Sequence, residues 1–170
     1  TGCGSIFASE KINGMPGVLW AEPDLIYEAQ LGDPPNSPND THFKKQWYQQ
    51  SGDAGVHARE AWMVSTGTDS ITVAVIDAGV DLKHPDLKGK IVPGYDFLDN
   101  DNEPQPGTKD AHGTACAGII GAVTNNDTGT AGIAWNCRIM PLRIGFGRLF
   151  SEDAAAKAFR FAHSHHAQVL

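Results

Sequence analysis

Residues 73–87, VAVIDAGVDLKHPDL, limit the possible folds of this chain more than any other segment. Four apolar residues lead directly into Asp77, and Ala-Gly follows it. A carboxylate that is buried at the end of such a segment without a partner is strongly destabilising. We therefore expect Asp77 to have either a nearby partner or a chemical task.

Strand-like and helix-like patterns alternate on both sides of Asp77. Residues 71–76 form a continuous apolar and largely β-branched run, which is typical of a strand buried within a parallel sheet. Further strands are predicted at 138–144 and 167–170. Helices are predicted at 58–64, at 112–123 and from a capping Ser151 onward. Such alternation predicts an α/β fold with a mainly parallel sheet.

The first 31 residues differ in composition from the rest of the chain. They include the strand-like run PGVLWAEPDLIYEAQ at 16–30, and the next segment, LGDPPNSPND, contains three prolines together with Gly, Asn and Asp. This composition is typical of an exposed linker. We therefore expect a boundary near residue 31, followed by one domain with its own core over 32–170.

Composition and charge argue against several classes of function. The net charge of −7 leaves no basic surface for phosphate backbones or anionic lipids, so neither nucleic acid nor a membrane is expected as a partner. No apolar run approaches the roughly 20 residues of a spanning helix. The first residues lack the layout of a signal peptide. The three cysteines fit neither a disulfide framework nor a Cys-x-x-Cys metal site.

The expected partner of Asp77 lies downstream, in DAHGTACAG at 110–118. His112 begins a predicted helix, and an imidazole there can reach a carboxylate at a neighbouring strand end, where the active sites of parallel sheets gather. A buried Asp beside Nδ1 fixes the tautomer of a histidine and stabilises its imidazolium, as in a hydrolase triad. A phosphate-binding Asp-x-Gly loop would also place a carboxylate at position 77 and is an alternative.

Four blocks of the sequence, in register and at similar separations, resemble the subtilisin-like serine proteases and most of all their thermitase-like members. The blocks are VAVIDAGVDLKHPDL, GYDFLDNDNEPQ, HGTACAG and AVTNNDTGTAG. The resemblance covers about residues 40–170, roughly the first half of the family's catalytic domain. It implies a three-layer α/β fold that is incomplete in this chain, and a triad in the order Asp, His, Ser.

The resemblance assigns Asp77 as the triad carboxylate and His112 as the general base of a serine endopeptidase acting on peptides or proteins. The nucleophilic Ser and the oxyanion Asn are expected C-terminal to Leu170, so the 170-residue chain alone is expected to be inactive. A truncated, non-catalytic peptide-binding module is the alternative. The resemblance further implies that 1–31 is the C-terminal part of an inhibitory propeptide, that 32–170 is the N-terminal half of the catalytic domain, and that the enzyme is a secreted, extracellular zymogen.

Calcium is the cofactor that the resemblance implies, at two sites. Ca²⁺ takes about six to eight oxygen ligands, and loops rich in Asp and Asn supply them. The first implied set is Asp96, Asp99, Asp101 and Gln105. The second implied set is Asp40, Asp86, the Asn126 side chain and the carbonyls of Val123, Thr128 and Thr130. A solvated acidic loop is the alternative for the first set, and only the resemblance joins the members of the second.

The chain departs from the family pattern close to the expected catalytic pair. Ala78 replaces the Ser or Thr that usually follows the triad Asp, and Ala115 stands where a second His is usual. Cys116 matches a free cysteine of the family beside the catalytic His, which implies sensitivity to mercurials. The strand that usually pairs with substrate by β-augmentation corresponds here to the slightly short GFGRLF at 145–150.

Overall fold

The structure is a computed structural model of the chain, and it describes residues 11–13, 15–16, 37–50 and 54–170. The chain divides into two units, residues 1–31 and 32–170, at the position where the proline-rich segment begins. In the first unit, residues 11–13 are helical. The strand-like run predicted at 16–30 lies, after Pro16, outside the described residues, so the propeptide interpretation stays a prediction.

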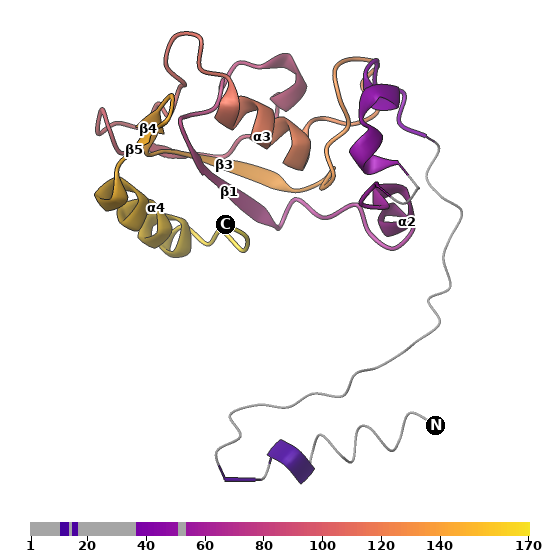
Figure 1. Cartoon of the computed structure of the whole chain (residues 1–170), viewed down its shortest axis with the longest axis horizontal. Coiled ribbons are helices and arrows are strands. Elements are labelled where there is room, and N and C mark those ends of the chain that lie inside the picture. Colours follow the sequence, from indigo (N-terminus) through magenta and orange to yellow (C-terminus); the bar gives the residue numbers. More distant parts are fainter. Residues whose placement is uncertain (1–10, 14, 17–36, 51–53) are drawn as a thin grey trace. The chain divides into compact units, whose positions relative to one another are not determined.

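Parallel strands form the sheet of the second unit (Figure 1). β1 (Thr72–Asp77) and β3 (Arg138–Arg143) pair along their whole length, so that Asp77 lies opposite Arg143 at the carboxyl edge. β2 (Tyr95–Asp96) pairs in parallel with the other side of β3, which gives the strand order β1-β3-β2. A parallel bridge between Val73 and Val169 extends the sheet beyond β1.

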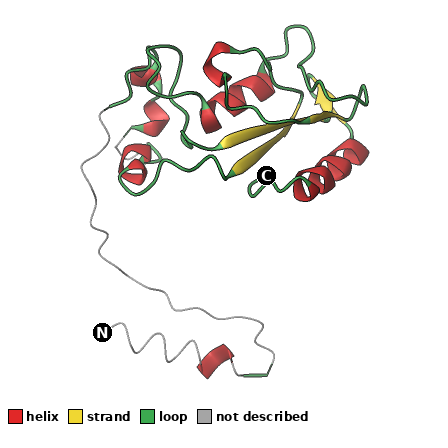
Figure 2. Ribbon diagram, turned by 180° about the vertical axis from the view of Figure 1, so that it is seen from behind, coloured by secondary structure: helices red, strands yellow, loops and turns green. Residues whose placement is uncertain are grey.

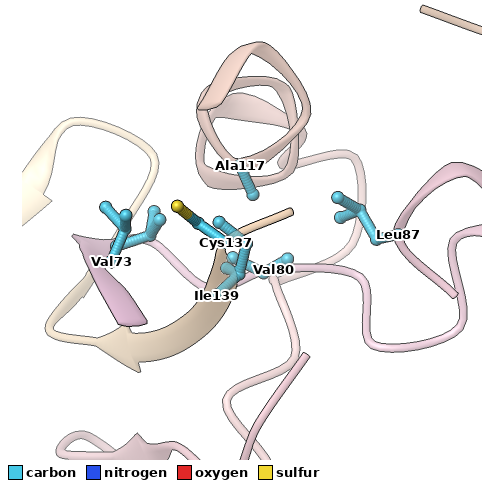
Figure 3. Close-up of a cluster of buried hydrophobic side chains, with 7 residues drawn as sticks. Val73, Val80, Leu87, Ala117, Cys137 and Ile139 are labelled. Carbon is cyan, nitrogen blue, oxygen red and sulfur yellow. The ribbon is translucent and has the colours of Figure 1, made fainter. Parts of the chain in front are cut away.

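Two helices cover opposite faces of this sheet, as Figures 1 and 2 show. They are α3 (His112–Gly121) and α4 (Glu152–Ser164). On the α3 face, Val73 and Ile139 belong to one buried cluster with Ala117 of the helix (Figure 3). On the α4 face, Met140 belongs to a second cluster. Neighbouring strand residues enter different clusters because successive side chains point to opposite faces. The result is a three-layer α/β/α arrangement.

Small side chains allow α4 to pack closely against the sheet. The buried stripe of this helix consists of Ala154, Ala158 and Ala162. Their spacing of four residues places them on one face of the helix. Ser151 caps the N-terminus of α4 as predicted, because its side chain accepts a hydrogen bond from the Ala154 N–H at 3.2 Å.

Shorter elements surround the sheet. They are the helix α2 (Ala58–Trp62), the 3-10 helices η1 (Phe43–Lys45), η2 (Trp47–Gln49) and η3 (Pro85–Leu87), and an antiparallel hairpin of β4 (Gly145–Phe146) and β5 (Leu149–Phe150). Phe43, Trp62 and Trp135 form a third apolar cluster beside α2. Within the part of the chain that the structure describes, every helix is too short or too polar to span a membrane.

The predicted helices at 58–64 and 112–123 and the predicted strands at 71–76 and 138–144 lie within two residues of their expected bounds, whereas the strand predicted at 167–170 is only an isolated bridge at Val169. The helix expected at 58–64 ends at Trp62, the helix expected at 112–123 ends at Gly121, and the strands expected at 71–76 and 138–144 are shifted or shortened by one residue. The resemblance implies a strand at 145–150, where the structure has the β4–β5 hairpin, but hydrophobic periodicity alone does not predict this hairpin. Its strands have two residues each, which is too short for an alternation to be recognised.

We predict that Ile139→Val lowers the free energy of unfolding by about 1 kcal/mol, because Ile139 is fully buried between α3 and the sheet and the lost methylene leaves a cavity. The matched control is Ile119→Val, since Ile119 lies on α3 but is 43% exposed. We expect the control to change stability by less than about 0.5 kcal/mol. Urea unfolding measures both changes, and equal losses in the two variants would contradict this assignment of the core.

Candidate active site

Asp77 ends β1 and His112 begins α3, and the two side chains meet at the carboxyl edge of the sheet. The His112 Nδ1 atom lies 2.8 Å from Oδ2 and 2.9 Å from Oδ1 of Asp77. The Asp77 side chain is 12% exposed, whereas that of His112 is 69% exposed. The carboxylate is therefore covered while the imidazole remains accessible to a ligand.

Backbone groups hold the Asp77 carboxylate in place. The Ala78 N–H donates a hydrogen bond of 2.7 Å to Oδ1, so an N–H group contacts the carboxylate although position 78 lacks the family's usual hydroxyl. A Cβ at Gly113 would contact the Gly79 carbonyl and would lie 3.0 Å from the Asp77 side chain. Glycine is needed at 113 because the start of α3 approaches the strand end so closely.

The surroundings of His112 favour its protonated form. Its pKa is raised above the ordinary value of 6.5, mainly by the hydrogen bond to Asp77 and then by the negative charge of that residue. Slight desolvation acts in the opposite direction, and the charge of Asp110 adds to the increase. An imidazolium stabilised by a carboxylate is the state that a histidine reaches when it acts as a general base.

Cys116 lies one helical turn after His112, with its Sγ atom 3.9 Å from Nδ1. Burial raises the pKa of the Cys116 thiol above 9.0, and the charge of Asp77 adds to this effect. The residue is therefore a neutral thiol near pH 7 rather than an activated nucleophile. The free cysteine expected beside the histidine is present, and its sensitivity to mercurials stays a prediction.

The second implied calcium set comes together around Asp86. Asp40 and Asp86 are each only 4% exposed. The loop 123–130 supplies donors to both, since the Asn125 N–H bonds Asp40 Oδ2 at 3.0 Å and the Thr130 N–H bonds Asp86 Oδ2 at 2.8 Å. The Oδ1 atom of Asp40 is buried and has no hydrogen-bond partner. A buried carboxylate oxygen without a donor is well suited to a hard cation.

The other members of this set lie in the same loop. Asn126 donates from Nδ2 to Asp86 Oδ1 at 3.1 Å, and its Oδ1 accepts the Thr128 N–H at 2.9 Å. The Thr130 hydroxyl also donates to Asp86 at 3.2 Å. The Val123 N–H donates to the Asp86 carbonyl at 2.7 Å. The structure thus brings together residues that are far apart in sequence, while the binding of an ion stays a prediction.

The first implied calcium set lies around β2. A basic residue that the sequence analysis does not identify, Arg143, forms ion pairs with two of its members. Arg143 Nη1 donates to Asp96 Oδ2 at 2.6 Å and to Asp99 Oδ2 at 2.7 Å. Asp101 pairs through its backbone with Asp96, and the Gln105 Oε1 accepts an N–H from the loop after β1 at 3.4 Å. The guanidinium is thus the positive charge beside this set. Its position at the end of a predicted buried strand is the signal that could have identified it.

Comparison with known proteins identifies the family of the chain. A family profile described as "Subtilase family" matches residues 68–170, more than half of the chain, and this range contains both Asp77 and His112. The chain belongs to the subtilase family. The subtilase interpretation made from the four sequence blocks is therefore confirmed.

Two curated subtilase relatives and one solved structure illustrate the similarity. The thermophilic serine proteinase of Bacillus sp. (strain AK1) is 45% identical over 134 residues, which are 79% of this chain and 31% of that protein. Thermitase of Thermoactinomyces vulgaris is 45% identical over 108 residues, 64% of this chain and 37% of that protein. A protease of Pseudoalteromonas arctica PAMC 21717 has a TM-score of 0.69 and 28% identity over 79% of this chain and 46% of that chain. The chain spans about a third of the length of these curated relatives.

The comparisons also decide the fold class. The mainly parallel sheet with helices on both faces is the incomplete α/β fold expected of a subtilase, and it superimposes on less than half of the solved protease. The alternative of a phosphate-binding Asp-x-Gly loop is excluded by the family match. In agreement with this, His112 rather than an open anion site faces the Asp77 carboxylate.

We predict that Asp77→Asn lowers the pKa of His112, because the variant removes the negative charge that raises it. A histidine whose pKa is raised in the folded state stabilises that state at pH values below 6.5, and this contribution is lost as the pH rises through the raised pKa. The variant should therefore lose more stability in acid than in base. NMR titration and urea unfolding on both sides of this range measure the two effects.

The control for this experiment is Asp69→Asn, since the Asp69 side chain is 72% exposed and its ion-pair partner is Arg138 rather than His112. This variant should leave the pKa of His112 unchanged. A pKa of His112 that is the same in Asp77→Asn and in the unmodified chain would contradict the assigned pairing.

Proposed function

We propose that this chain supplies the Asp and the His of a serine endopeptidase that hydrolyses peptide bonds in peptide or protein substrates. The observation that carries the proposal is the 2.8 Å contact between Asp77 and His112 in a chain of the subtilase family. In this mechanism His112 accepts the proton of a nucleophilic hydroxyl and later donates it to the leaving amine. Asp77 fixes the tautomer and stabilises the imidazolium.

The geometry indicates which ring nitrogen does which task. Because Nδ1 faces both carboxylate oxygens of Asp77, we assign the donated hydrogen to Nδ1 and the exchange of protons with substrate to Nε2. In the part of the chain that the structure describes, no serine hydroxyl is hydrogen-bonded to His112. The family order Asp, His, Ser supports a nucleophile and an oxyanion Asn further along the protein than Leu170.

The β4–β5 hairpin is the element that we propose pairs with substrate. It follows β3 at the same edge of the sheet as Asp77, whose carbonyl accepts the Ile144 N–H at 2.9 Å. Phe146, Leu149 and Phe150 are each more than half exposed and offer apolar surface to substrate side chains. An extended peptide that adds to such an edge gains backbone hydrogen bonds. This placement brings a bound peptide close to the accessible face of His112.

Residues 1–31 are, in this proposal, the end of an inhibitory propeptide, and the mature protein is a secreted enzyme. The division of the chain at residues 31 and 32 supports a separate N-terminal segment. The proline-rich composition that follows the boundary supports a processing region that a protease can reach. The propeptide is then one partner of the catalytic domain, and peptide or protein substrates are the other.

Calcium is the proposed cofactor, and the donor atoms around Asp40 and Asp86 fit it. The buried Oδ1 of Asp40 lacks a partner, and the Asp86 side chain and loop 123–130 supply further oxygens of the kind that Ca²⁺ prefers. When bound, the ion would supply positive charge to two buried carboxylates. It would thereby join the segment before η1 to the loop after α3. The Asp96 set is the other proposed site, where Arg143 already provides a positive charge.

We predict that the full-length protein hydrolyses a fluorogenic peptide and is labelled by a fluorophosphonate. His112→Ala should lower kcat by about 10⁶-fold, the loss that removal of the triad histidine produces in subtilisin. The control is His163→Ala, because His163 is an exposed residue in the last turn of α4. Absence of both hydrolysis and labelling in the unmodified protein would favour a non-catalytic peptide-binding module instead.

We predict that CaCl₂ raises the Tm of the 170-residue chain relative to EDTA, because an ion that binds only the folded state stabilises it. Asp40→Asn should reduce this increase by removing one carboxylate charge from the site. Asp69→Asn, which changes an exposed residue elsewhere, should retain the full increase. Differential scanning calorimetry measures the three Tm values. An increase of the same size in Asp40→Asn would contradict the proposed site.

A further inference from the structure

We propose that Asp110 is a positioning residue that ties the turn of the β4–β5 hairpin to the start of α3. Through this tie it holds the substrate-pairing hairpin at a set distance from His112. The inference rests on the proposed function for the role of the hairpin. Asp110 itself belongs to neither the proposed catalytic pair nor the calcium sets.

The two oxygens of the Asp110 carboxylate bond two different segments. Oδ2 accepts the Gly147 N–H at 2.7 Å, and Oδ1 accepts the His112 N–H at 3.3 Å. Gly147 lies between β4 and β5 and is 37 positions from Asp110 in sequence. Hydrogen bonds from N–H groups to a charged carboxylate are stronger than bonds between neutral groups. One side chain thus bridges the hairpin turn and the backbone of the proposed general base.

The local backbone presents Asp110 for this task. Lys109, immediately before it, adopts a left-handed conformation with φ of 67°, which is uncommon for a residue other than glycine. The Asp110 N–H closes the turn by donating to the Gly107 carbonyl at 2.9 Å. Ala111, the N-cap residue of α3, has no side chain that can accept a hydrogen bond. Asp110 supplies both an acceptor and a negative charge at this helix start.

Among the described residues, few other interactions hold the tip of the hairpin. There, β4 and β5 pair through Gly145 with Phe150 and through Phe146 with Leu149. Phe146 and Leu149, which flank the turn, are 54% and 64% exposed, so the turn has little apolar packing. A hairpin of this length is marginally stable without further contacts. The 2.7 Å bond from Gly147 to Asp110 is therefore well placed to decide where the hairpin lies.

Asp110 also acts on His112 through its charge. Over the described residues, the charged and titratable groups that face the imidazole are Asp77, Asp110 and the Cys116 thiol. Removing the Asp110 charge leaves the Asp77 contact in place, so the expected decrease in the pKa of His112 is smaller than in Asp77→Asn. This readout separates a residue coupled to His112 from one that only stabilises the loop.

The test compares Asp110→Ala, Asp110→Asn and the control Glu103→Gln, which removes one negative charge from an exposed loop residue. In the 170-residue chain, amide hydrogen exchange at Gly147 should accelerate about tenfold in Asp110→Ala. Asp110→Asn keeps one acceptor oxygen and should show a smaller acceleration. The pKa of His112 should fall in both Asp110 variants and stay constant in the control.

The second arm uses the full-length enzyme. Asp110→Ala should lower kcat/KM for an extended peptide more than for a single-residue ester, because only the extended peptide reaches the hairpin. Equal losses on the two substrates would overturn the positioning role. Unchanged exchange at Gly147 together with an unchanged pKa of His112 would overturn the tie itself. Neither of these two measurements needs a substrate, so they test the contact between Asp110 and Gly147 independently of activity. If the unmodified enzyme hydrolyses nothing, that result contradicts the proposed function alone.

Discussion

The contact between the covered carboxylate of Asp77 and the imidazole of His112 depends on how closely β1 and α3 approach each other. That approach requires glycine at 113, since any Cβ there would meet the Gly79 carbonyl. It also requires a packed interface of small and β-branched residues below the site, where Ala117 contacts the sheet. The geometry of the Asp77–His112 contact is therefore a product of core packing. A change in the layer between α3 and the sheet would move the histidine relative to its carboxylate.

Most of the acidic side chains discussed above contact a positively charged group or an N–H donor that offsets the cost of removing the carboxylate from water. Asp77 has the imidazole and a backbone N–H, and Asp96 has the guanidinium of Arg143. Asp110, which is only partly buried, accepts hydrogen bonds from backbone N–H groups with both of its oxygens. Asp40 is the exception, because one of its oxygens is buried without a partner. This contrast is why the Asp40 and Asp86 region is the stronger of the two proposed calcium sites.

Much of the fold and the Asp77–His112 contact could be predicted because the signals that place them are local. A β-branched run ending in Asp77 identifies a buried strand and its carboxyl end, and His112 at a helix start identifies a partner. The family resemblance supplied their roles. The end of a predicted strand places Arg143 at the carboxyl edge of the sheet, but its pairing with Asp96 and the hydrogen bond from Gly147 to Asp110 could not be predicted, because no sequence pattern relates these segments to each other. Hydrophobic periodicity along the sequence does not indicate which loops meet at one edge of a sheet.

The order of strands and helices, the α/β class and the identity of the Asp–His pair all follow from the order of residues along the chain. They do so because hydrophobic periodicity and chain order are one-dimensional properties. Distances between loops belong to the tertiary structure alone. The meeting of both Asp40 and Asp86 with the 123–130 loop is of this kind. The hydrogen bond from Gly147 to Asp110 is also a property of the tertiary structure. Such contacts form only when packing of the core brings loops from separate parts of the chain together.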